Sequence, residues 1–199
     1  MTVEPPRTLL ITCGALAGEI VALVRDNGWD SMKVKCLPAH IHNTPEHIPD
    51  GVRRLIHAGR EDFEQILVLF ADCGTGGKLD EVLAEEDVVR VGGSHCYEVY
   101  AGPEAYAEMM QNEPGSFFLT DFLARHFDRL IIQGLALDRH PKLRDIYFGK
   151  YRKLVYLSQN EAPDLRARAE AAAERLGLAF EERRTGYGGY REFLKTHQA

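Results

Sequence analysis

Apolar runs alternate along the chain with segments in which apolar residues recur at helical spacing. Short runs rich in aliphatic and β-branched residues, bounded by Gly, Pro or charged residues, are typical of strands. They lie at residues 8–12, 32–37, 65–70, 88–91, 116–120, 153–157 and 178–181. Segments with apolar residues three or four positions apart predict helices. These lie at residues 18–25, 45–59, 79–85, 103–110, 163–176 and 190–194.

This alternation predicts an α/β fold with Rossmann-like layering, in which flanking helices cover a sheet of mostly parallel strands. The chain has 199 residues, which is enough for one sizeable α/β domain and too few for two ordinary ones. No repeat of fixed period, low-complexity tract or linker interrupts it. We therefore expect a single α/β domain over residues 1–199.

The composition of the chain argues against several classes of function. Hydrophobic residues make up 45% and charged residues 27% of the chain, which is ordinary for a globular protein. The net charge of −6 and the pI near 5.8 argue against a nucleic-acid partner. No apolar run approaches the roughly 20 residues that span a bilayer, and the N-terminal residues lack a signal core. We expect a cytoplasmic protein with no membrane partner, in which free, metal-bound or catalytic thiols are favoured over disulfides.

Three of the four cysteines share one context. Cys13, Cys73 and Cys96 each follow an apolar run and lie beside glycines, whereas Cys36 does not. Because the carboxyl ends of parallel strands meet at one edge of a sheet, we expect these three thiols to lie together. Three thiolates repel each other unless a cation neutralises them, which indicates zinc with an open position or an iron–sulfur cluster. The alternative is that each is a small buried hydrophobic residue.

Nearby polar residues are candidate supporting groups. His40 and His42, two positions apart on a segment expected to be extended, would face the same side. We interpret His40 and His95 as candidate catalytic residues or nitrogen ligands, and His42 as a loop histidine that is hydrogen-bonded locally. Glu19, on the helix after the first cysteine, is a candidate base or orienting group, or simply a favourable charge in a helical first turn.

Glycine-rich loops supply the candidate cofactor-binding residues Gly14, Gly74, Thr75 and Gly76. Backbone N–H groups of the loop after residue 73 could bind phosphate at a helix N-terminus, although the loop matches neither a dinucleotide fingerprint nor a P-loop. The similar glycine-rich segment at residues 186–190 is interpreted as a flexible turn.

These motifs together resemble the domain-of-unknown-function family number 1638 over nearly the whole chain. The segments that carry the resemblance are Cys13-Gly14-Ala15-Leu16 with Glu19, the His42 loop, Cys73-Gly74-Thr75-Gly76, His95-Cys96 with Gly102, Phe117-Phe118-Leu119-Thr120, and His140-Pro141 with Phe148-Gly149 and Tyr151. The family's cysteine pattern matches Cys13, Cys73 and Cys96. The resemblance implies one-carbon or metal-cofactor chemistry, with a corrinoid as a further cofactor and a corrinoid or methyltransferase protein as a partner.

The resulting hypothesis is a three-cysteine site for a metal or metallocofactor, in an enzyme of thiol or one-carbon metabolism. A metal-bound thiolate stays nucleophilic at neutral pH, which suits methyl transfer. One alternative is a non-catalytic protein that delivers a cofactor or metal. Another is a phosphate- or nucleotide-binding domain with structural cysteines. A small-molecule or metallocofactor ligand is expected, and a homodimer is compatible with such a domain.

Overall fold

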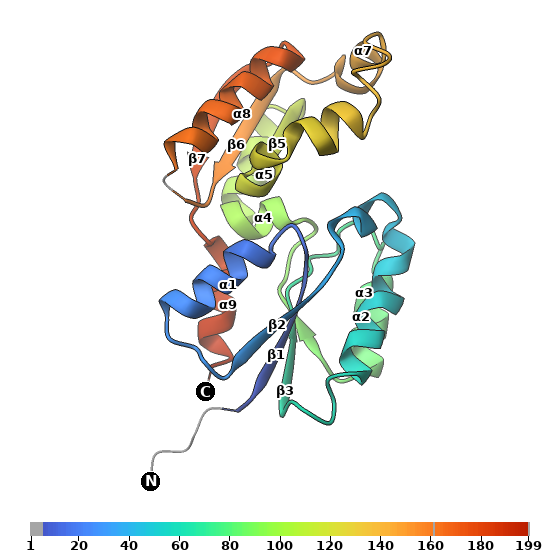
Figure 1. The fold of residues 1–199 in the computed structure, drawn as a ribbon, viewed down its shortest axis with the longest axis vertical. Coiled ribbons are helices and arrows are strands. Elements are labelled where there is room, and N and C mark those ends of the chain that lie inside the picture. The colour runs from blue at the N-terminus through green and yellow to red at the C-terminus, as the bar shows by residue number, and fades with distance from the viewer. Residues whose placement is uncertain (1–5, 161, 199) are drawn as a thin grey trace. The chain divides into compact units, whose positions relative to one another are not determined.

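The fold is described here from a computed structural model, which covers residues 6–160 and 162–198 (Figure 1). Every strand pair in these residues is parallel, and helices connect the strands. The predicted α/β class with parallel strands is therefore confirmed. The chain forms two compact units, one of residues up to Val99 together with those from Tyr187 onward, and one of residues Tyr100–Gly186. The sequence shows no linker or change of composition at this division, and we had expected a single domain.

The first unit is built on a four-stranded sheet in the order β2-β1-β3-β4. The strands are β1 (Thr8–Cys13), β2 (Met32–Leu37), β3 (Gln65–Val68) and β4 (Val89–Arg90). All six residues of β1 are buried, because this strand has neighbours on both edges and helices over both faces. Thr8 pairs with Met32 of β2 and with Gln65 of β3, so the three strands start in register.

Helices cover both faces of this sheet. Figure 1 shows α1 and α9 on one face and α2 and α3 on the other. The helices are α1 (Ala17–Asp26), α2 (Ile48–His57), α3 (Lys78–Glu85) and α9 (Gly188–Thr196), and α4 (Cys96–Ala101) begins in this unit. Each buries aliphatic residues against the strands, as amphipathic spacing predicts.

Two local predictions in this unit are wrong. The segment after β2 forms two short 3-10 helices, η1 (Ala39–Asn43) and η2 (Pro45–His47), in place of an extended loop. The following helix starts at Ile48 rather than at Pro45, because Pro49 suits a first turn and Thr44 makes no side-chain cap. Of the glycine-rich segment 186–190, residues 186–187 form a turn, but Gly188 already opens α9. A Cβ atom at Gly189 would lie 3.2 Å from the Val99 carbonyl oxygen, so glycine permits the close packing of this helix.

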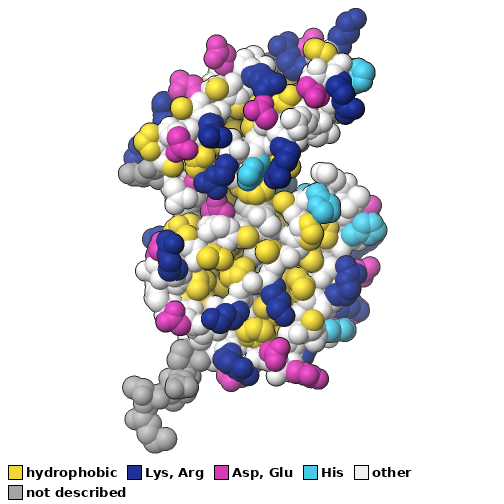
Figure 2. Space-filling model, in the orientation of Figure 1, with side chains coloured by type: hydrophobic (Ala, Val, Ile, Leu, Met, Phe, Trp, Pro, Cys, Tyr) yellow, Lys and Arg dark blue, Asp and Glu magenta, His cyan; other side chains and the backbone are white. Residues whose placement is uncertain are grey.

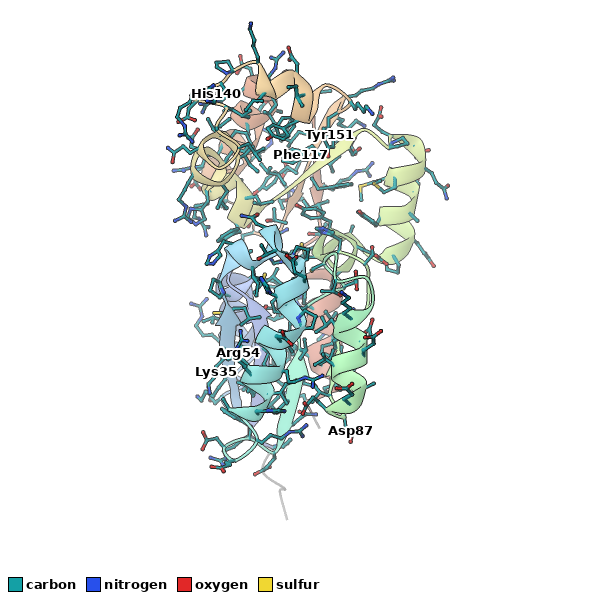
Figure 3. All side chains as sticks on the ribbon, turned by 90° about the vertical axis from the view of Figure 1, so that its right-hand side faces the viewer. Lys35, Arg54, Asp87, Phe117, His140 and Tyr151 are labelled. Atoms are coloured by element: carbon teal, nitrogen blue, oxygen red, sulfur yellow. The ribbon has the colours of Figure 1, made fainter. Side chains whose placement is uncertain are left out.

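The second unit is built on the three-stranded parallel sheet β5-β6-β7. The strands are β5 (Ser116–Thr120), β6 (Lys153–Ser158) and β7 (Ala179–Arg184). Its helices are α5 (Pro103–Asn112), α6 (Asp121–Arg125), α7 (Leu143–Phe148) and α8 (Pro163–Leu176), with a π-helix, η3, over Asp128–Gln133. The rings of Phe117 and Tyr151, labelled in Figure 3, pack edge to face with centroids 5.7 Å apart. Helix α8 has the bounds predicted for this segment, and Gly177 follows its last residue in the left-handed conformation (φ +71°).

Charged and apolar side chains are interspersed on the face shown in Figure 2. Large apolar residues are exposed on α7 and just after it, where Ile146 is 74% and Tyr151 37% accessible. None of the helices in the described part of the chain is both long and apolar enough to cross a membrane.

Candidate thiol site

The carboxyl edge of the first sheet contains the point at which strand order reverses. From β1 the chain crosses to β2 on one side, and from β3 it crosses to β4 on the other. Open α/β sheets bind ligands at such a point, outside the carboxyl ends of the strands. Cys13 is the last residue of β1, and Cys73 lies in the loop that follows β3. These two thiols therefore come from the two strands that flank the reversal, and Cys96 follows the next strand, β4.

Backbone contacts hold the cysteine loops together. The N–H groups of Asp72 and Cys73 donate hydrogen bonds to the carbonyl oxygens of Gly93 and Ser94, each at 3.0 Å. These bonds join the loop after β3 to the loop after β4, which leads into Cys96 at the start of α4. The loops that contain Cys73 and Cys96 are thus one hydrogen-bonded assembly.

The loop after β1 packs closely against the segment after β2. The N–H of Gly14 donates to the Leu37 carbonyl at 2.7 Å. A Cβ atom at Gly14 would lie 3.2 Å from the backbone nitrogen of Ala39, which would force two backbones apart. Gly14 is thus required by packing, and its N–H is already bonded within the protein. The candidate role of Gly14 in holding a cofactor is not tested by this contact.

The three thiols lie close enough to influence each other's ionisation. The pKa of Cys13 is raised to about 12, chiefly by burial and in smaller part by charges on Cys73 and Cys36. Burial raises the pKa of Cys73 to about 11, and Asp72 adds to the effect. The pKa of Cys96 is raised well above its usual value, first by burial and then by Cys73 and Cys13. The Arg90 guanidinium opposes this effect at Cys73 without cancelling it, so all three groups are held as neutral thiols at pH 7.

Backbone N–H groups point at the sulfur atoms and oppose this effect. Those of Ala15 and Leu16, at the start of α1, bond to the sulfur of Cys13 and lower its pKa. The N–H of Cys96 does the same for the sulfur of Cys73. Such bonds favour a thiolate, so the site offers stabilising dipoles that become effective once a cation offsets burial.

Cys73 has a strained backbone. Its φ is +51°, in the left-handed region that a side chain other than glycine seldom adopts. Strain of this kind costs about 1–3 kcal/mol and is concentrated at functional sites. The conformation turns the chain sharply at the end of the apolar run and leaves the Cys73 side chain buried, at 7% exposure.

The glycine-rich loop after Cys73 binds its own carboxylate. Asp72 accepts hydrogen bonds from the Thr75 hydroxyl at 2.6 Å and from the N–H groups of Gly77 at 2.9 Å and Gly76 at 3.2 Å. The bond from Thr75, followed by those from the loop N–H groups, lowers the pKa of Asp72. These donors are the ones that the phosphate interpretation of the loop requires. Since Asp72 uses them, the loop is better suited to presenting Cys73 than to binding an anion.

The paired-histidine prediction is wrong in its geometry. His40 and His42 lie on η1, a 3-10 helix with three residues per turn, so positions two apart do not face the same side. His40 is exposed. The Nδ1 atom of His42 lies 3.0 Å from the Ala39 carbonyl oxygen, and its ring stacks on Phe70 at 6.1 Å. This arrangement matches the interpretation of His42 as a locally bonded loop residue.

His95 lies beside the third thiol. Its Nδ1 is 3.8 Å from the sulfur of Cys96, and its ring stacks on Tyr97 with centroids 4.6 Å apart. Burial, followed by the charge of His42, lowers the pKa of His95. A neutral imidazole is the form that can accept a proton or bind a metal. His95 is therefore better placed than His40 to support chemistry at Cys96.

Glu19 is buried, with 6% of its surface exposed, in the first turn of α1. Its place in the first turn agrees with the simpler of the two interpretations from sequence, although its side chain is buried. Its charge acts on Tyr187, whose pKa is raised first by burial and then by Asp26 and Glu19. Glu19 therefore lies near the start of α9, and its candidate catalytic role stays a prediction.

The arrangement of the three cysteine side chains bears on whether they could bind a single metal ion. Within residues 6–160 and 162–198, no group of three or more His, Cys, Asp or Glu side chains is arranged to hold one metal ion. The three thiols share one sheet edge and influence each other electrostatically, yet they do not converge on a single point. Cys36 is exposed on β2, and its charge also raises the pKa of Cys13, so it lies near this group without belonging to a glycine-rich loop.

One polar cluster was not anticipated. Asp121, directly after β5, is fully buried and accepts hydrogen bonds from the Tyr156 hydroxyl at 2.6 Å and the Gln159 N–H at 3.1 Å. The N–H and side-chain amide of Asn160 also donate to it, each at 3.0 Å. The signal was present in sequence, because Asp121 and Gln159 both follow buried strands. The carboxylate is so completely bonded that we interpret the cluster as structural, joining the ends of β5 and β6.

Comparison of the chain with known proteins identifies a protein family. No curated protein matches the chain. A solved structure, "The crystal structure of transcription regulator GntR from Chromobacterium violaceum", is 13% identical, with a TM-score of 0.36 over 88% of this chain and 77% of that one. A likeness of that size supports no argument about fold or function. A family model described as "Protein of unknown function (DUF1638)" matches residues 36–194, a span that begins at Cys36 and excludes Cys13.

Proposed function

We propose that this chain, which belongs to the DUF1638 family of proteins of unknown function, binds a metallocofactor through the thiolates of Cys13, Cys73 and Cys96. The observation that most supports the proposal is the position of three thiols at the sheet edge where strand order reverses, with Cys73 and Cys13 close enough to Cys96 to raise its pKa. Three buried thiols in one place are costly to ionise, and a cation removes that cost. Binding and deprotonation would therefore be coupled.

An iron–sulfur cluster suits these residues better than a single zinc ion. In a [4Fe–4S] cluster each thiolate binds a different iron atom, so its ligand sulfurs stand further apart than the ligands of one ion. In the described residues no three such side chains are arranged around a single ion, which counts against zinc. The N–H groups of Ala15, Leu16 and Cys96 would also bond to the ligating sulfurs, which is a common means of tuning such cofactors. When bound, the cofactor would supply electron transfer or a Lewis-acidic iron.

His95 is the residue that we assign to a supporting role. Its imidazole is neutral and lies beside Cys96, so it can bond to the thiolate or accept a proton near it. A catalytic role in methyl transfer, a corrinoid or methyltransferase partner, and a cytoplasmic location all stay predictions.

The test is anaerobic reconstitution of the full chain with ferrous iron and sulfide, and separately with zinc. We expect sulfur-to-iron charge-transfer absorption, with iron and sulfide in stoichiometric amounts. Cys73→Ser should abolish uptake, and Cys13→Ser and Cys96→Ser should reduce or abolish it. Cys36→Ser is the matched control, since that thiol is exposed on β2. Circular dichroism establishes that each variant is folded. Colourless wild-type protein without iron, or equal loss in Cys36→Ser, would contradict the proposal.

A further inference from the structure

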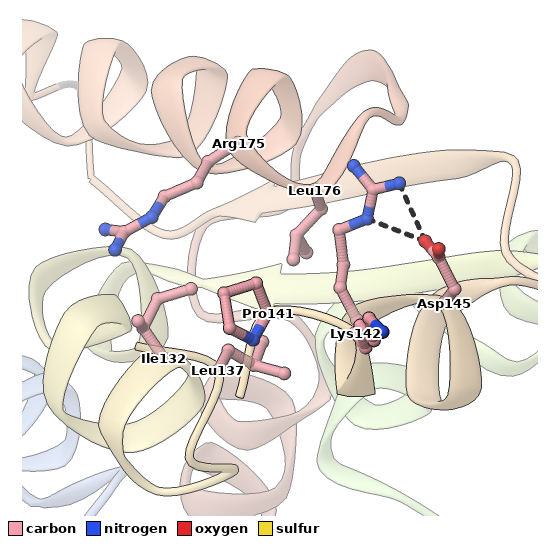
Figure 4. Close-up of a pocket in the computed structure, with 8 residues that line it drawn as sticks. Ile132, Leu137, Pro141, Lys142, Asp145, Arg175 and Leu176 are labelled. Atoms are coloured by element: carbon pink, nitrogen blue, oxygen red, sulfur yellow. Dashed lines mark hydrogen bonds and ion pairs between the residues drawn. The ribbon is translucent and has the colours of Figure 1, made fainter. Parts of the chain in front are cut away.

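The second unit contains a cavity of about 450 Å³, remote in sequence from all three thiols (Figure 4). Its volume falls in the range of roughly 300–1,000 Å³ that is usual for small-molecule sites. Ile132, Leu137 and Leu176 form an apolar floor. Lys142 and Arg175 extend from two different segments at its rim, and the figure shows them around that floor.

Two backbone irregularities build the wall of this cavity. Ile132 lies in the π-helix η3, a form that is rare and frequently occurs at functional sites. Ala136, four residues further on, has a φ of +56°, which is strained for a residue with a Cβ atom. That turn brings Leu137 into the cavity, where its N–H donates to the Ile132 carbonyl at 2.8 Å. The local fold thus stores strain at the place where the cavity forms.

The lining is basic although the chain as a whole carries a net charge of −6. Lys142, Arg144 and Arg175 line the cavity, and the acidic lining residue is Asp145. Asp145 accepts hydrogen bonds from Arg144 at 2.7 and 3.0 Å, which neutralises that pair. Lys142 and Arg175 have no acidic partner among the lining residues, and Arg175 pairs with Asp128 outside the lining.

We propose that this cavity binds a small organic anion with an apolar body and a single carboxylate or phosphate group. The apolar part would lie on Leu137 and Leu176, and the anionic group would contact Lys142 and Arg175. Arg175 pairs with Asp128, which is exposed. Exposed pairs of this kind contribute little, so a ligand can replace Asp128 as the partner of Arg175 at small cost.

The test uses anilinonaphthalene sulfonate, a fluorescent apolar anion, with the neutral phenylnaphthylamine as its comparison. Lys142→Glu and Arg175→Glu alter exposed side chains at the rim, and Lys150→Glu makes the same charge change at an exposed position outside the lining. We expect each rim variant to bind the anion about tenfold more weakly, with Lys150→Glu unchanged. Amide chemical-shift changes on titration should be confined to residues around Leu137 and Leu176.

Competition by phenylbutyrate and by phenyl phosphate then distinguishes carboxylates from phosphates, since the better ligand displaces the dye at lower concentration. Equal affinity of wild type and both rim variants, equally tight binding of the neutral dye, or shift changes elsewhere in the chain would each overturn the proposal. Failure of this test has no bearing on the thiol site, because the residues that line the cavity and the three cysteines belong to different units of the chain.

Discussion

The backbone N–H of Cys73 donates a hydrogen bond to the carbonyl oxygen of Ser94 at 3.0 Å. This bond links loops that follow two adjacent parallel strands, β3 and β4. Cys96 lies two residues beyond Ser94, and its own N–H bonds to the sulfur of Cys73. Backbone contacts thus hold the thiol of Cys96 beside that of Cys73, 23 positions earlier in the chain, and both cysteines are free of disulfides.

Thiol reactivity should separate one cysteine from the other three. In metal-free protein at pH 8, iodoacetamide should modify exposed Cys36 first. With a pKa of about 11, Cys73 is a thiolate in only about one molecule in a thousand at that pH. Its rate should therefore rise about tenfold per pH unit up to pH 10. Mass spectrometry of the peptides follows each site, and Cys36→Ser should remove the fast phase. Equally fast labelling of Cys73 would show that its thiol is not held neutral.

The Asp72 loop should make stability depend on acid pH. The pKa of Asp72 is lowered in the folded protein, so the ionised carboxylate stabilises the fold above its unfolded pKa near 4. That contribution is lost as pH falls through the lower, folded pKa. Asp72→Ala should reduce the free energy of unfolding by about 1–3 kcal/mol at pH 7, because bonds to a charged acceptor are removed. Urea unfolding at several pH values measures this.

The difference between wild type and Asp72→Ala should begin to shrink below about pH 4 and be lost as pH falls through the lower folded pKa of Asp72, where the wild-type carboxylate also becomes neutral. Asp30→Ala, at an exposed position, is the control and should change stability by no more than about 0.5 kcal/mol. A gap that stays constant from pH 7 to pH 3 would mean that the charge of Asp72 does not stabilise its loop.

The Tyr156 hydroxyl should contribute measurably to the second unit. Burial and the hydrogen bond to Asp121 raise the pKa of Tyr156, so its O–H stays a donor to the buried carboxylate. Tyr156→Phe removes that donor and should cost about 2 kcal/mol of unfolding free energy. Tyr151→Phe keeps the ring that packs on Phe117 and should cost less than about 0.5 kcal/mol. Equal losses in the two variants would show that the Asp121 cluster is not held together by this bond.

Local sequence patterns were sufficient to predict most helices and strands. The run at residues 32–37 alternates and forms β2 with the same bounds, and the Ala-rich helix that ends before Gly177 does so in the structure. These predictions hold because propensity, periodicity and helix stops act over a few residues. The prediction for the segment after β2 was wrong because a local pattern carries no information on distant packing. Its first 3-10 helix packs closely against Gly14, which is distant in the chain.

What the sequence determined by itself is the set of strands and the position of a cysteine after three of them. The direction of those strands follows from the alternation with helices, and with it the expectation that the three thiols share an edge. Tertiary structure alone decided that the strands divide into two sheets in two units, that Asp72 occupies the donors of its own loop, and that His42 and His95 differ in environment. Each of these depends on which surfaces are buried against each other, and burial is a property of the folded chain that no local pattern contains.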